Sequence, residues 1–141
     1  MKHITPIAVL LGLTFAAGEA FAHDDAYLDT QKAPHGGQLR MAGPYHYELV
    51  LARDADPARE SPVIVYVTDH AGAKIPTAGA QGSATILAGK LKATSTLKPD
   101  GDNRMKGFAK YASTPDMKVV VSIALSGKPA EQARFTPRLS P

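Results

Sequence analysis

Hydrophobic and polar residues alternate along most of the chain after residue 36, and this two-residue period is typical of β-strands. In residues 45–51 the odd positions are tyrosine or leucine, whereas the even positions begin with His46 and Glu48. In residues 117–125 every odd position is apolar. β-Branched residues predict another strand at 63–68. Further strands are expected at residues 83–88, 91–98, 105–111 and 131–135.

Strong turn signals separate these segments. Gly89-Lys90, Pro99–Asn103 and Ser126–Pro129 place glycine, proline or asparagine where the chain would reverse. Seven or eight short strands with turns about every 8–12 residues are typical of a sandwich or a barrel. We expect an all-β domain over residues 35–137, folded as a two-sheet Greek-key sandwich of immunoglobulin-like or cupredoxin-like shape. No helix is expected after residue 22.

The first 22 residues have the pattern of a cleaved secretory signal peptide. Lys2 gives a short basic start, residues 4–15 are mostly apolar, and Ala20-Phe21-Ala22 fits the small-x-small rule for cleavage. We therefore expect export, a mature chain that begins at His23, and no membrane span after cleavage. Residues 23–34 are polar and lack a period, which predicts a mobile N-terminal arm.

The composition excludes several kinds of ligand and catalytic site. Cysteine is absent, so thiolate metal ligands, thioether haem attachment and a cysteine nucleophile are excluded. The formal net charge is +3, the basic residues are scattered, and only 6% of the residues are aromatic, so a nucleic-acid partner is not expected. The sequence contains no G-x-S-x-G, H-E-x-x-H or phosphate-binding glycine loop, and we do not expect an enzyme.

His23 is the sharpest candidate for chemistry, because cleavage would leave it with a free α-amine. The amine and the ring Nδ1 can chelate one metal ion, and both lose their protons near neutrality, with unperturbed pKa values of about 7.7 and 6.5. Nitrogen ligands in a tetragonal array favour Cu(II), with zinc or another divalent transition metal as the alternative. The competing interpretation is that cleavage falls before a histidine by coincidence.

Three other residues are candidates to complete such a site. His35 lies in Pro34-His35-Gly36-Gly37, a stiff approach followed by a tight turn, and is otherwise an exposed turn histidine. His46 and Glu48 project from one face of a strand, roughly 6.5–7 Å apart, close enough to share an ion or to contact each other. Polar residues on the solvated face of an amphipathic strand are the competing interpretation. The candidate metal ligands are therefore His23, His35, His46 and Glu48.

The remaining histidine and methionines carry weaker signals. His70 follows a strand and is expected to be a turn residue, so it ranks last among these histidines. Met117 is in register with the apolar positions of its strand and is expected in the core. Met41 remains a candidate soft ligand, of the kind that favours Cu(I).

Several motifs occur together in a recognisable order. They are Pro34–Gly37, Gly43–Val50, Val63–Gly72, Lys98–Asn103 and Ala133–Phe135. Together they resemble a group of small exported proteins of Gram-negative bacteria, and the N-terminal periplasmic segment of adaptor subunits of heavy-metal efflux pumps. The resemblance implies an all-β periplasmic module associated with metal handling, with His35 and Glu48 as ligand candidates. Because the chain lacks the helical hairpin, lipoyl-like and barrel parts of a full adaptor, a pump-bridging role is not implied.

A second resemblance is to periplasmic copper-resistance proteins of the C type. It rests on His23, the expected compartment and the fold class. In that family the mature N-terminal histidine binds Cu(II) together with a later histidine and a carboxylate, so the resemblance implies the same use of His23.

Two hypotheses from different classes follow. The first is a periplasmic copper-binding protein that acts as a chaperone or buffer in metal resistance or efflux, with a metal-efflux system or another periplasmic protein as its partner. The second is an exported β-sandwich that binds a protein partner through exposed sheet edges, with histidines that have no specific metal role. An oxidative copper enzyme is a poorer third hypothesis, because the chain has no tryptophan to form a broad aromatic substrate face.

Overall fold

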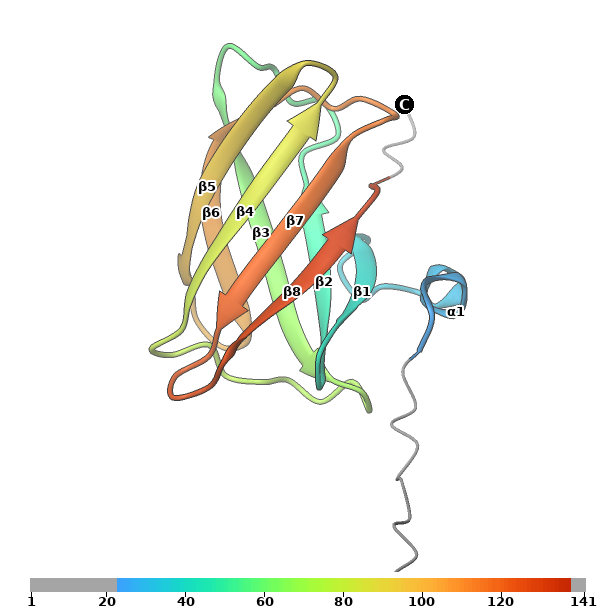
Figure 1. The fold of residues 1–141 in the computed structure, drawn as a ribbon, viewed down its shortest axis with the longest axis vertical. Helices are drawn as coiled ribbons and strands as arrows, with labels where there is room; N and C mark the ends of the chain where they lie inside the picture. The colour runs from blue at the N-terminus through green and yellow to red at the C-terminus, as the bar shows by residue number, and fades with distance from the viewer. Residues whose placement is uncertain (1–22, 138–141) are drawn as a thin grey trace, which may run out of the picture.

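A computed structural model describes residues 23–137, so the expected signal peptide lies outside the described residues. The described chain is all-β, as predicted, apart from one short helix (Figure 1). The helix is α1 (Asp25–Thr30). The strands are β1 (Gln38–Ala42), β2 (Tyr45–Leu51), β3 (Glu60–Asp69), β4 (Gln81–Ala88), β5 (Leu91–Pro99), β6 (Arg104–Lys110), β7 (Lys118–Ala124) and β8 (Ala130–Phe135).

The strands form one antiparallel sheet that is nearly closed into a barrel, in the order β1-β2-β3-β6-β5-β4-β7-β8. The sheet is continuous because β5 pairs with β4 along most of its length and then with β6 through Lys98 and Pro99. The predicted division into two sheets is therefore not shown. The order around β3, β6, β5 and β4 is that of a Greek key, since the meander β4-β5-β6 returns to lie beside β3.

The core follows the predicted alternation. In β2, Tyr47 and Leu49 are buried, and in β7 the apolar odd positions are buried together with the preceding Met117, which confirms its core position. Leu91 is an apolar exception to this burial, at 54% exposure. It begins β5 directly after the Gly89-Lys90 turn and pairs with Ala88, the last residue of β4.

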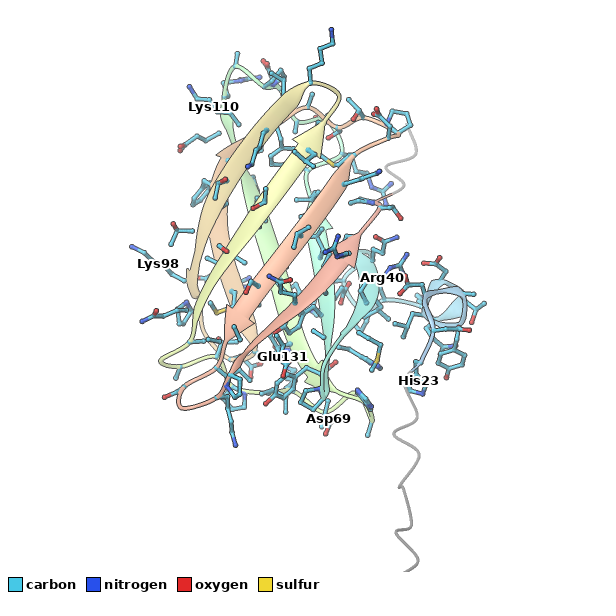
Figure 2. The ribbon with its side chains drawn as sticks, in the orientation of Figure 1. His23, Arg40, Asp69, Lys98, Lys110 and Glu131 are labelled. Atoms are coloured by element: carbon cyan, nitrogen blue, oxygen red, sulfur yellow. The ribbon has the colours of Figure 1, made fainter. Side chains whose placement is uncertain are left out.

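Tight turns bring distant strands to one end of the barrel. Gly43 and Pro44 join β1 to β2, and Gly43 has a φ of 55°, a conformation that favours glycine. A side chain at Gly43 would also collide with the carboxyl group of Glu131 on β8. The same end of the barrel carries Asp69, at the end of β3 (Figure 2).

The segment 25–30 forms α1, so the expectation that no helix follows residue 22 was wrong. Asp24 caps α1, and its side chain accepts a hydrogen bond of 2.7 Å from the backbone N–H of Tyr27. The helix lies outside the barrel beside β1 (Figure 1). Within residues 23–137, no helix has the length and hydropathy needed to cross a membrane.

Candidate functional site

Four of the five histidines of the chain line one pocket; the fifth, His3, lies outside the described residues. The pocket has a volume of about 250 Å³ and lies between the N-terminal arm and the outward-facing residues of β2 and β3. Its histidines are His23, His35, His46 and His70. A larger groove of about 360 Å³, which shares Leu28, Gln31 and Leu39 with this pocket, has no histidine in its lining.

The strand register explains how His46 and His70 meet. On β2, His46 pairs with Met41 of β1 on one side and with Thr68 of β3 on the other. His70 follows β3 by one residue, which returns the chain to the same end of the sheet. The rings of His46 and His70 lie 4.8 Å apart, centroid to centroid, and are stacked at 18°.

His23 reaches the same place from the N-terminal arm. Its Nδ1 lies 3.3 Å from Nε2 of His46, and its ring centroid lies 5.8 Å from that of His70. The ring of Tyr27 on α1 also packs against His23, with ring centroids 4.7 Å apart. Three imidazoles from separate parts of the chain therefore form one group, which we call the histidine cluster: His23, His46 and His70.

Burial and the two neighbouring imidazoles lower the pKa of His46. Burial is the largest cause, because His46 is 8% exposed, and repulsion from His70 and His23 adds to it. Asp69 acts in the opposite direction and raises the pKa. His46 is thus held as a neutral imidazole at neutral pH, which is the form that binds metals.

His35 and Glu48 form a separate pair in the same pocket. His35 Nδ1 lies 2.8 Å from Oε1 of Glu48, while Oε2 accepts hydrogen bonds from the backbone N–H groups of His35 (2.9 Å) and Gly37 (3.0 Å). The His35 ring stacks on Tyr66 at 3.5 Å and 1°. Both carboxylate oxygens of Glu48 therefore have partners. Glu48 orients the His35 ring by engaging its Nδ1, and Nε2 of His35 is the ring nitrogen left for a ligand.

Gly37 makes this pairing geometrically possible. A Cβ at Gly37 would lie 2.2 Å from the carbonyl oxygen of Leu49, far inside the contact distance. Only glycine lets the chain pass this close to β2 while its N–H points at Glu48. The Pro34–Gly37 motif therefore has a local structural role, whichever ligand the pocket takes.

Besides the contact of His23 with His46, α1 contacts the barrel through Leu28 and through ion pairs with Arg40. Leu28 is the buried residue of α1, at 2% exposure. Arg40 on β1 pairs with Asp29 at 2.8 Å and with Asp25 at 3.4 Å, one turn apart on α1. The arm carboxylates are thus occupied in capping and ion pairs rather than aimed into the pocket.

The structure separates the candidate ligands into two groups. It brings His23 and His46 together, and it pairs His35 with Glu48. The competing interpretation of His46 and Glu48 as residues on a solvated face was wrong, because the arm covers that face and both are buried. His70 is a turn residue, as predicted, but sequence reasoning missed its place beside His46, because the register of β2 against β3 cannot be read from one sequence.

As the side chains stand, the residues described here contain no group of three or more histidines and carboxylates arranged to hold a metal ion. The stacking of His46 on His70 explains this, because parallel rings do not direct their nitrogens at one point. No protein-family model matches the chain, and no curated protein is similar enough to it to be counted as a match.

Proposed function

We propose that this chain is a periplasmic metal-binding protein that holds copper, as a chaperone or buffer in metal resistance or efflux. The observation that carries the proposal is the pair of ring nitrogens, His23 Nδ1 and His46 Nε2, 3.3 Å apart in a pocket lined by four histidines. Two nitrogens about 2.0 Å from one ion are about 2.8 Å apart in a square arrangement and about 3.3 Å apart in a tetrahedral one. The separation equals the tetrahedral value, so a tetragonal Cu(II) site would bring the two nitrogens about 0.5 Å closer together.

The identity of the nitrogen on His23 adds to this argument. Nδ1 is the ring nitrogen that closes a small chelate ring with the α-amine of the same residue, and it is the one turned toward His46. Without metal, the two nitrogens share one hydrogen bond. A metal ion would replace the shared proton and use both lone pairs.

The remaining donors also favour a nitrogen-preferring metal. The pocket offers imidazoles, while its one carboxylate, Glu48, is engaged with His35 and two backbone N–H groups. An all-nitrogen set selects Cu(II) over harder ions, and Cu(II) also leads zinc in the divalent affinity order. The resemblance to exported metal-handling modules points to the same class of protein.

The experiment is a competition titration of Cu(II) against a chelating dye, using protein whose N-terminal residue is verified as His23 by mass spectrometry. We expect one ion per chain with a dissociation constant far below about 10⁻⁵ M, the range of a loose surface site. The matched control carries one extra residue before His23, which removes the terminal amine, and should bind more weakly.

Binding no tighter than about 10⁻⁵ M in both proteins would reject the metal-binding function and favour the partner-binding hypothesis. Equal and tight binding in both would move the site away from the terminal amine. Substitution of His35 by asparagine would then show whether His35 Nε2 takes part.

A further inference from the structure

The histidine cluster is assembled from two parts of the molecule. His46 belongs to the barrel and His70 directly follows its strand β3, whereas His23 belongs to the N-terminal arm, just before α1. The chain between α1 and β1 crosses from the arm to the sheet within residues 31–37. Any ion held by His23 and His46 together would therefore join the arm to the barrel.

His70 is placed and mobile enough to be the third ligand. It is exposed, and its only described side-chain hydrogen bond is a long one of 3.4 Å from Nε2 to the carbonyl of Gly43. Exposed side chains change rotamer within nanoseconds, so a ring that now stacks on His46 can turn its nitrogen toward an ion. Its backbone position after β3 already keeps it within 5.8 Å of His23, ring to ring.

The attachment of the arm without metal rests on few contacts. A helix of six residues has little stability of its own and depends on packing. Leu28 provides the buried apolar contact, and His23 and His46 share a hydrogen bond of 3.3 Å. Arg40 is buried, but its partners Asp25 and Asp29 are 68% and 51% exposed, so solvent weakens both ion pairs. Segments held this way open locally more often than the barrel strands do.

We propose that His70 is a third imidazole ligand and that a bound ion locks the arm onto the barrel. The arm then acts as a closing segment. It moves away from the barrel for the ion to enter or leave, and an ion bound by the three imidazoles keeps it against the barrel. This inference rests on the proposed function, because it concerns the same pocket. It adds a ligand, His70, and a metal-dependent closure.

The test measures Cu(II) affinity and backbone amide exchange of the arm on the same samples. In the wild-type protein, Cu(II) should slow amide exchange in residues 25–31 by tenfold or more relative to the metal-free protein. His70→Asn should weaken Cu(II) binding by tenfold or more and remove most of this slowing. Lys92→Asn, at an exposed position on β5 outside the pocket, is the control and should preserve both effects.

The outcomes separate the two proposals. If the wild-type protein fails to bind Cu(II) tightly, the proposed function itself is wrong. If it binds tightly but arm exchange is unchanged, or if His70→Asn binds as the wild type does, then the third ligand and the locked arm are wrong while metal binding stands. Because His70 lies in an exposed turn, circular dichroism of His70→Asn should match the wild type and exclude misfolding as the cause.

Discussion

At the scale of single residues, burial of His46 sets its protonation. The covered face of β2 and the two neighbouring imidazoles oppose the charged form, and Asp69 compensates only in part. The pKa of His46 in the folded protein is therefore below its ordinary value of 6.5. The unfolded chain takes up a proton near 6.5, and the folded chain takes it up only at lower pH.

The stability of the metal-free protein should consequently fall as the pH is lowered. Well above pH 6.5 His46 is neutral in both states and contributes no pH dependence. Below it, the unfolded state binds more protons, so the free energy of unfolding decreases until the lowered pKa is passed. Urea unfolding with chelator present, from pH 7.5 to pH 5, measures this. His46→Gln should show a shallower decrease, and equal slopes in the two proteins would contradict the account.

Glu48 is a second residue whose environment makes a definite prediction. Its buried carboxylate satisfies two backbone N–H groups and the ring of His35. Glu48→Gln removes the negative charge and places an amide donor against other donors, so it should destabilise the protein by about 1–3 kcal/mol. Urea unfolding at pH 7.5 checks the value, with Glu60→Gln at an exposed position as the control. A loss as small as that of the control would mean that Glu48 does not anchor the Pro34–Gly37 turn.

These residues also show what the sequence can and cannot predict about the site. Alternation placed His46 and Glu48 on one face of β2, and the position of His35 in its glycine motif was plain. Burial of that face could not be predicted, because the covering residues lie in the arm. The stacking of His70 on His46 depends on strand register, which a single sequence leaves open.

At the scale of elements, α1 is the feature that shapes the pocket. The sequence around it contains the right signals, with Asp24 at the cap and Leu28 four residues later, but six residues give no usable helical period. The helix exists because its own Leu28 is buried and because Arg40 on β1 pairs with its carboxylate Asp29. Tertiary contact decides the conformation here, which is why the segment was expected to be irregular.

Leu28→Ala should therefore loosen the arm without unfolding the barrel. Replacing a buried leucine by alanine lowers the free energy of unfolding by about 2–5 kcal/mol when the surrounding structure stays in place. We expect faster amide exchange in residues 25–31 and unchanged exchange in β7, with faster release of Cu(II) to an excess of chelator. Leu87→Ala, at a 43% exposed position on β4, is the control. Equal acceleration in β7 would show that α1 and the barrel unfold together.

At the scale of the whole molecule, the sheet nearly closes between its first and last strands. Gln38 of β1 supplies the join, because its side-chain amide donates to the carbonyl of Thr136 at 3.2 Å and accepts from the Thr136 N–H at 2.9 Å. From the interior, the Tyr47 hydroxyl on β2 donates to the carbonyl of Glu131 on β8 at 3.3 Å.

Strand count and spacing predicted an all-β fold with Greek-key connections, but short alternating strands are common to sandwiches and barrels. The Pro99–Asn103 turn favours pairing of β5 with β6, but the change of partner along β5, from β4 to β6, which makes the sheet continuous, leaves no mark in the period.

Removing the Gln38 side chain should weaken the contact between β1 and the end of β8. Gln38→Ala leaves the backbone groups of Thr136 to solvent, so the loss of stability should be about 1 kcal/mol, with faster exchange of the Thr136 amide. Gln132→Ala, an exposed position on β8, serves as the control in both measurements. Unchanged exchange at Thr136 in Gln38→Ala would mean that the closure does not depend on this side chain.

The central claim is that His23 and His46 bind one metal ion between the arm and the barrel. The most direct test is an electron paramagnetic resonance spectrum of the protein with one equivalent of Cu(II), recorded for the wild type and for His46→Asn. We predict a nitrogen-rich tetragonal spectrum in the wild type that loses an imidazole nitrogen, and much of its affinity, in the variant. Identical spectra and affinities in the two proteins would place the copper elsewhere and contradict the claim.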